Sequence, residues 1–151
     1  MRNSEQQAVR RGRGAAQMAV MVAAMLACAC GSSTPAGQVS FVAPKDGATV
    51  KSPVHFEFAA ENYTISPVPD GTVEHARDGI GHFHLGVEAD CLPSGQAIPK
   101  GTPGWVHFGK GDKTIDMQLA PGSHKFSLQA GDDLHRTVAG LCQTISLTVE
   151  P

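Results

Sequence analysis

The sequence predicts an all-β protein: its main domain is expected to be an immunoglobulin-like β-sandwich of about seven short antiparallel strands, with a small β-barrel as the alternative. Two observations lead to this prediction. From Gln38 onward apolar residues recur at every second position, and Gly or Pro interrupts them about every eight to twelve residues. No part of this region has a convincing helical pattern.

Turn-forming residues separate the predicted strands. Pro44-Lys45-Asp46-Gly47 follows the first strand, the segment 109–112 links two later ones, and Pro121-Gly122 precedes another. Two longer connections, 60–80 and 89–104, exceed hairpin length and are expected to cover the domain or to serve function. The apolar positions expected to face the core are Val39 and Phe41; Val54, Phe56 and Phe58; Phe83, Leu85 and Val87; Val106 and Phe108; Ile115, Met117 and Leu119; Phe126, Leu128 and Ala130; and Ile145, Leu147 and Val149.

The first 29 residues predict a lipoprotein-type signal peptide, because four arginines precede an apolar run from Ala15 to Ala29. This run has about 15 residues, fewer than the roughly 20 that a membrane-spanning helix needs. Residues 30–37 predict a flexible tether, and residues 38–151 a single β-sandwich domain. The segment is therefore expected to direct export.

The apolar run ends on Ala27-Cys28-Ala29-Cys30-Gly31, which resembles the lipobox of bacterial lipoproteins, in which the Cys becomes the lipidated first residue. Cys30 is preferred over Cys28 because the tether begins directly after it. Cleavage by ordinary signal peptidase without lipidation is the alternative. The resemblance implies attachment to a membrane through the N-terminal lipid. No Asp follows the cysteine, which implies an outer-membrane or periplasm-facing lipoprotein.

The charge balance argues against nucleic acid as a partner. Net charge is −2, and removing the signal peptide takes away four arginines and Glu5, which brings it to −5. We find no Ser/His/Asp or Cys/His set, no phosphate-binding Gly loop and no paired carboxylates at a catalytic spacing. The sequence therefore predicts no catalytic residues and no organic cofactor.

Cys91 and Cys142 are the two cysteines that remain after the signal peptide. In an oxidising compartment they predict a disulfide. It would close a loop of about 50 residues and contribute roughly 3 to 4 kcal/mol in the chain-entropy model. Neither cysteine lies in a Cys-x-x-Cys spacing, so a redox role is less favoured.

Histidines on the predicted strands give the most specific functional signal. If Phe83 faces the core, His82 and His84 share the opposite face of the same strand, about 6.6 Å apart. By the same alternation His107 points outward, and His135 lies in a loop that can turn back onto the sheet end. We therefore predict that a surface cluster of His82, His84, His107 and His135 holds a transition metal, Cu first and Zn second, because neutral imidazoles suit these ions.

The other histidines have structural explanations. His124 is in phase with core positions, so it is expected to be partly buried and hydrogen-bonded, whereas His55 and His75 are expected on the surface. Asp132 and Glu88 are candidates for orienting the ligand rings. Trp105 is expected to pack over a sheet edge.

From Val39 to Val149 the chain resembles a bacterial family of exported domains known as domain of unknown function 4399. The resemblance implies that His82, His84, His107, His124 and His135 occupy family motif positions, but it implies no activity. The chain departs from the family pattern at Phe83 and Asp112, and it has no second His soon after His135. The matching motifs are Gly81-His82-Phe83-His84-Leu85, His107-Phe108-Gly109-Lys110-Gly111, Leu119-Ala120-Pro121-Gly122-Ser123-His124 and Gly131-Asp132-Asp133-Leu134-His135.

Two local similarities bear on the chemistry. The segment 119–149 is similar to the end of periplasmic copper-resistance proteins of immunoglobulin-like fold, which implies a loop His that binds copper. His82-Phe83-His84 with Cys91, Cys142 and His135 is similar to Cu/Zn superoxide dismutase, although the zinc subsite of that enzyme has no clear counterpart. The sequence thus predicts an exported, lipid-anchored metal-binding domain that is not an enzyme. An envelope interaction module that contacts a protein or glycan without metal is the alternative, and a dismutase-like oxidoreductase is less favoured.

Overall fold

The structure is a computed structural model that describes residues 37–99 and 104–151. The predicted signal peptide, the choice between Cys28 and Cys30 and nearly all of the tether lie outside these residues. All regular structure in the described part is β-strand, so this part contains no helix long and apolar enough to cross a membrane.

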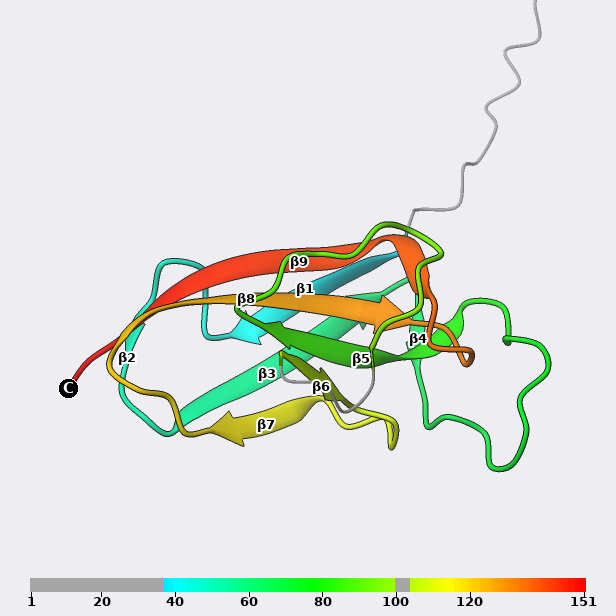
Figure 1. Ribbon diagram of the computed structural model, residues 1–151, viewed down its shortest axis with the longest axis horizontal. Helices are drawn as coiled ribbons and strands as arrows, with labels where there is room; N and C mark the ends of the chain where they lie inside the picture. The colour runs from blue at the N-terminus through cyan, green and yellow to red at the C-terminus, as the bar shows by residue number, and fades with distance from the viewer. Residues whose placement is uncertain (1–36, 100–103) are drawn as a thin grey trace, which may run out of the picture. The chain divides into compact units, whose positions relative to one another are not determined.

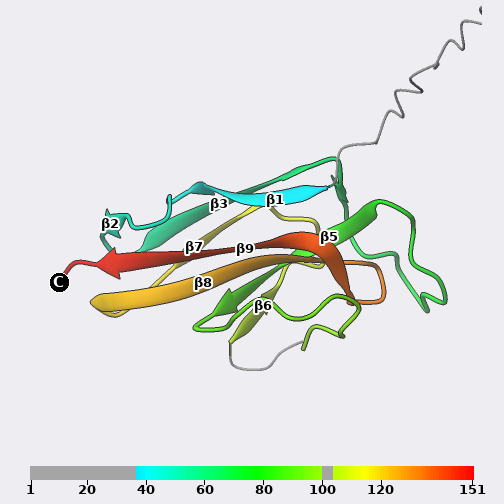
Figure 2. The same ribbon diagram turned by 90° about the horizontal axis from the view of Figure 1, so that it is seen from above.

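The strands form two sheets that face each other (Figures 1 and 2). One sheet has the order β1-β3-β7, and the other has the order β2-β9-β8-β5-β4, with β6 pairing with β5. The all-β prediction is confirmed, and two separate sheets are the arrangement of a sandwich. The strands are β1 (Gln38–Ala43), β2 (Thr49–Val50), β3 (Val54–Glu61), β4 (Thr64–Ile65), β5 (Ile80–Val87), β6 (Trp105–His107), β7 (Thr114–Met117), β8 (Gly122–Gly131) and β9 (Thr137–Val149).

The pairing differs from the prediction in one respect. The seven predicted strands are present and pair antiparallel, but β2 and β4 are additional two-residue strands that pair in parallel with β9 and β5. Two residues are too short for alternation to be visible in the sequence. Along β5, β4 pairs with Ile80 and Gly81 whereas β6 pairs with 84–86, so His82 lies between the two edge partners.

Phenylalanines fill the space between the sheets. Phe58 of β3 has its ring centroid 5.7 Å from that of Phe83 on the facing sheet and 5.4 Å from that of Phe108. Phe56 of β3 lies 4.8 Å from Phe126 of β8. These contacts between the two sheets hold β3, β5 and β8 in place. They confirm that the alternate residues predicted to face the core do so.

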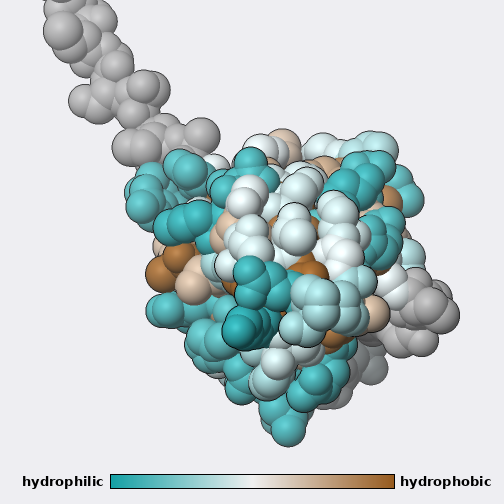
Figure 3. Space-filling model, turned by 90° about the vertical axis from the view of Figure 1, so that its left-hand side faces the viewer, coloured by the Kyte–Doolittle hydropathy of each residue, from teal (hydrophilic) through white to brown (hydrophobic). Residues whose placement is uncertain are grey.

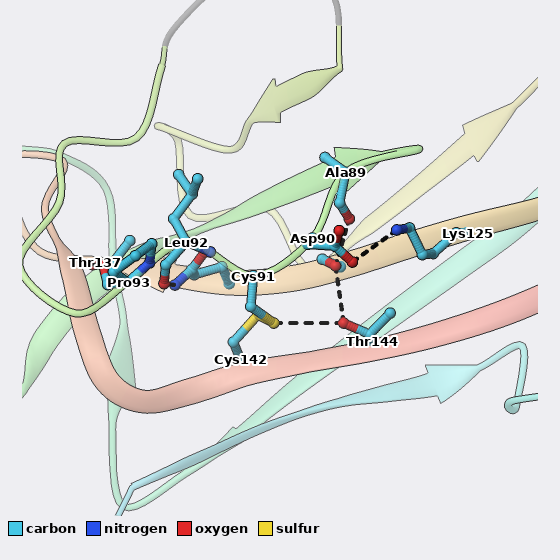
Figure 4. Close-up of a disulfide and its surroundings, with 11 residues drawn as sticks. Ala89, Asp90, Cys91, Leu92, Pro93, Lys125, Thr137, Cys142 and Thr144 are labelled. Atoms are coloured by element: carbon cyan, nitrogen blue, oxygen red, sulfur yellow. Dashed lines mark hydrogen bonds and ion pairs between the residues drawn. A yellow bond between two sulfur atoms is a disulfide. The ribbon is translucent and has the colours of Figure 1, made fainter.

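The predicted disulfide is present between Cys91 and Cys142, whose Cα atoms are 6.1 Å apart (Figure 4). It fastens the segment after β5 to β9. In the same segment Leu92 donates its backbone N–H to Gln129 and accepts a bond from the amide of that side chain, and Ser127 donates to the carbonyl of Ala89. The segment therefore lies across the outer face of β8 and buries Ser127 and Gln129.

Hydrophilic and neutral residues cover most of the end of the domain that carries the C-terminus (Figure 3). Among the described residues Val42, at 37% exposure, is the one large hydrophobic side chain that is exposed. The described surface thus presents no large apolar patch for a partner.

Candidate metal centre

His82 and His84 lie on the outer face of β5, opposite the core-facing Phe83, as the alternation predicts. The prediction that they belong to a surface cluster is wrong, because both side chains are 0% exposed. The physical reason is the segment after β5, which returns over this face. Its Ile98 is buried and donates a backbone hydrogen bond of 2.8 Å to the carbonyl of His135.

His107 and His135 close the cluster from the solvent side. His107 lies on β6 directly opposite His84 of β5, and its side chain is exposed. His135 occupies the turn between β8 and β9 with a φ of 61°. Asp132 shapes this turn, since its carboxylate accepts bonds from the backbone N–H groups of Leu134 and Arg136. Asp132 thus holds the turn that carries a candidate ligand.

The structure brings all four predicted histidines together. The six distances between their ring centroids run from 4.6 Å for His82–His84 to 5.7 Å for His84–His135. The Nε2 atoms of His107 and His135 are 3.0 Å apart, and one nitrogen from each ring lies within 4.8 Å of all the others. Nitrogens around a tetrahedral ion are about 3.3 Å apart, so small ring movements complete such a site.

His82 provides the test of whether these residues fit a metal. Within the described residues, neither of its two buried ring nitrogens has a hydrogen-bond partner. Such burial without a partner costs free energy that native proteins normally avoid. Burial, together with the nearby His135 and His107, lowers the pKa of His82 to about 4. The ring is therefore neutral at physiological pH, which is the form that binds a metal ion.

Two glycines leave room for the rings. A Cβ atom built on Gly109 would lie 2.4 Å from Cε1 of His107, and one built on Gly131 would lie 2.8 Å from Cε1 of His84. Both distances are shorter than real Cβ contacts, so a larger residue at either position requires the ring to move. No sequence pattern indicates this requirement, because it depends on contacts across the site.

The substitution Gly109→Ala is expected to displace His107 and weaken metal binding about tenfold, the scale seen when ligand-orienting groups are removed. Because His107 is exposed, the thermal unfolding midpoint of the metal-free protein should change by only a few degrees. Calorimetric titration with Cu²⁺ and a thermal melt of the same sample measure both quantities. An unchanged affinity for Cu²⁺ would show that metal binding does not require His107 in its present position.

A buried ion pair fixes the turn that carries His135. The Asp133 side chain is 1% exposed and accepts bonds from Arg77 through the backbone N–H at 3.0 Å, Nε at 2.8 Å and Nη2 at 2.8 Å. These bonds hold the pKa of Asp133 near 2. Arg77 also donates to the carbonyl of Pro67, so it ties residues 66–79, which loop out between β4 and β5 in Figure 1, to the turn. No motif or periodicity in the sequence marks Arg77.

The remaining histidines lie outside the cluster. His124 contacts the carbonyl of Ala120 at 2.8 Å and the carboxylate of Glu88 at 2.9 Å, and these two bonds raise its pKa. It is partly buried, as predicted, and Glu88 faces His124 rather than orienting the ligand rings. His55 and His75 are exposed, also as predicted. Trp105, the first residue of the edge strand β6, packs over Gly86 of β5.

The fold and this cluster define a β-sandwich domain with a candidate transition-metal centre of four imidazoles. Comparison with known families identifies the chain as a member of the family described as Domain of unknown function (DUF4399), whose model matches residues 55–150. The resemblance seen in the sequence is thereby confirmed. The similarities to copper-resistance proteins and to Cu/Zn superoxide dismutase stay predictions.

Other comparisons add little. No curated protein matches the chain at a significant level. Among solved structures, an endo-beta-1,4-mannanase from Thermotoga petrophila matches with a TM-score of 0.47 and 17% identity. The match covers 80% of this chain and 21% of the mannanase chain, so this chain spans about a fifth of that protein.

Proposed function

We propose that the domain binds one transition-metal ion, Cu first and Zn second, through His82, His84, His107 and His135. Imidazole nitrogens are ligands that these two metals accept readily, whereas Ca²⁺ and Mg²⁺ prefer oxygen. A bound ion would give a ring nitrogen of His82 the partner that it lacks among the described residues. Binding, with no chemistry on a substrate, is the proposed role.

The observation that carries this proposal is His82. A buried histidine with a purely structural role normally hydrogen-bonds through at least one ring nitrogen. Within the described residues His82 has no such bond, yet the ring centroids of three further imidazoles lie 4.6 to 4.9 Å from its own. His124 supplies the contrast inside the same chain, because both of its nitrogens contact oxygen acceptors.

We also propose that the metal site works outside the cytoplasm, on a lipid anchor at Cys30. Support comes from the apolar N-terminal run and lipobox-like ending, and from the disulfide, which suits an oxidising compartment. Mass spectrometry of membrane-extracted protein tests the anchor. A diacylglyceryl mass on Cys30 that is lost in Cys30→Ser supports it, and a soluble chain that begins beyond Cys30 contradicts it.

Metal content and affinity test the proposed metal site. Protein purified without a polyhistidine tag is expected to take up one Cu²⁺ or Zn²⁺ per chain by elemental analysis. His84→Ala and His107→Ala should each weaken binding in calorimetric titration by tenfold or more. His75→Ala is the matched control, since His75 is exposed and outside the cluster, and it should leave affinity unchanged. Equal binding by all three variants would refute the site and favour the interaction module.

A further inference from the structure

The cluster has a closed side and an open side. His82 and His84 are fully buried against the sheet, whereas His107 and His135 border a pocket of about 620 Å³. An external molecule can therefore approach a bound ion past His107 and His135. The other residues that line this pocket are Val68, Gly109, Lys110 and Asp112.

The wall that carries Lys110 is built by backbone contacts. Gly109 accepts a hydrogen bond of 3.0 Å from the backbone N–H of Val68, and Gly111 donates one of 2.9 Å to the carbonyl of Phe108. Gly111 has a φ of +80°, and a Cβ there would approach Ser66 and Pro67 to 3.1 Å. The turn therefore packs closely against residues 66–68. Lys110, between Gly109 and Gly111 in the sequence, lies in this turn at the pocket wall.

The charges around the pocket favour an anion once a divalent ion is bound. Lys110 and Asp112 are exposed, and within residues 37–99 and 104–151 neither belongs to an ion pair. Their charges offset each other. The nearby Asp132 and Asp133 are paired with Arg136 and Arg77. The two positive charges of the metal ion therefore dominate the local field.

We infer that this pocket is a binding site for a small monovalent anion, of the size of a simple carboxylate, which coordinates the bound metal between His107 and His135. Lys110 attracts the anion and Asp112 opposes it. The inference rests on the proposed metal site and extends it. A copper ion with tetragonal geometry, or a zinc ion that expands from four to five ligands, accepts such an additional donor.

Azide serves as the probe because its binding to Cu²⁺ produces a charge-transfer absorption and changes the electron paramagnetic resonance spectrum. The Cu²⁺-loaded protein is titrated with sodium azide at constant, low ionic strength. A saturable spectral change with one azide per copper is expected. Lys110→Gln should weaken azide binding about two- to fivefold, the range of an exposed charge interaction. Asp112→Asn should strengthen it by a similar factor.

Lys113→Gln is the matched control, because Lys113 is an exposed lysine on the same connection that does not line the pocket. It should leave azide affinity unchanged, and sodium perchlorate should shrink the difference between the Lys110 and Asp112 variants. Copper content, measured on each sample before titration, separates the two proposals. Full copper loading without any azide-dependent change overturns the anion site alone, as does equal azide affinity in all three variants. Absence of copper uptake overturns the metal site and the anion site together.

Discussion

The substitution His82→Leu is expected to stabilise the metal-free protein while weakening its binding of Cu²⁺ by tenfold or more. His82 is 0% exposed, and within the described residues its two ring nitrogens have no hydrogen-bond partner. Burying an unsatisfied polar group costs about 1 to 3 kcal/mol, and leucine removes this cost while filling similar space. Chemical denaturation with a chelator present should show an unfolding free energy about 1 to 3 kcal/mol higher than that of the wild type.

Phe83→Leu is the matched control for this experiment. Phe83 neighbours His82 on β5 but points into the core, where it contacts Phe58. Its replacement should destabilise the protein by about 1 kcal/mol and leave metal binding intact. A His82→Leu variant that loses as much stability as Phe83→Leu would indicate that His82 is a packing residue, and the metal proposal would lose its main support.

Adding saturating Cu²⁺ should reverse the order of stability. An ion that binds only the folded wild type stabilises it by about 4 kcal/mol at a thousandfold excess over the dissociation constant. The leucine variant lacks one ligand and gains much less. Binding and catalytic centres commonly make the ligand-free protein less stable than it would be without the functional residues.

Alternation along the strands was enough to predict which face each residue occupies. Phe83 and Leu85 do lie in the core, and His82 and His84 do lie on the opposite face. Alternation cannot predict what later covers that face. The covering segment of residues 89–99 has no period, and it is held by a disulfide and by bonds to Gln129. A predicted surface cluster is therefore half buried in the structure.

Residues that position the ligands were harder to predict than the ligands. Histidine has a distinctive chemistry, and the His-x-His spacing on a strand limits where the rings can point. Gly109 and Gly131 matter only because imidazoles pass close to their backbones. Arg77 is 56 residues from Asp133 in sequence and lies in a connection without periodicity. Such long-range pairs become visible only when the two segments are seen side by side.

Loss of the ion pair between Arg77 and Asp133 is the second change that we expect to have a large effect on stability. Replacement of Arg77 by methionine leaves the buried carboxylate of Asp133 without the guanidinium that neutralises it. Loss of one partner leaves the other charge buried and uncompensated, and solvent at the 39% exposed Arg77 side chain reduces this effect. We expect Arg77→Met to reduce the unfolding free energy at neutral pH, and to do so more than the removal of an exposed ion pair does.

The effect of Arg77→Met should depend on pH in a defined direction. The folded-state pKa of Asp133 is about 2, below the ordinary value of 3.8. A lowered pKa contributes stability that is present above 3.8 and is lost as the pH falls toward 2. The difference in unfolding free energy between wild type and variant should therefore be constant from pH 5 to 7 and shrink below pH 4. A difference that grows on acidification would contradict the assignment.

The same variant should also weaken the metal site, because Asp133 lies two residues before His135 in the turn that Arg77 fastens. Loss of a partner that orients a metal ligand lowers affinity about 10- to 100-fold. Lys125→Met is the matched control, since Lys125 pairs with Asp90 through a bond of 2.7 Å in which both side chains are exposed. Such an exposed pair contributes at most about 1 kcal/mol, and its loss should leave Cu²⁺ affinity unchanged. Calorimetric titration at a temperature where all three proteins are folded separates the positioning of His135 from the stability of the fold. If Arg77→Met is destabilised but binds Cu²⁺ as tightly as the wild type does, the turn holds His135 in place without the ion pair.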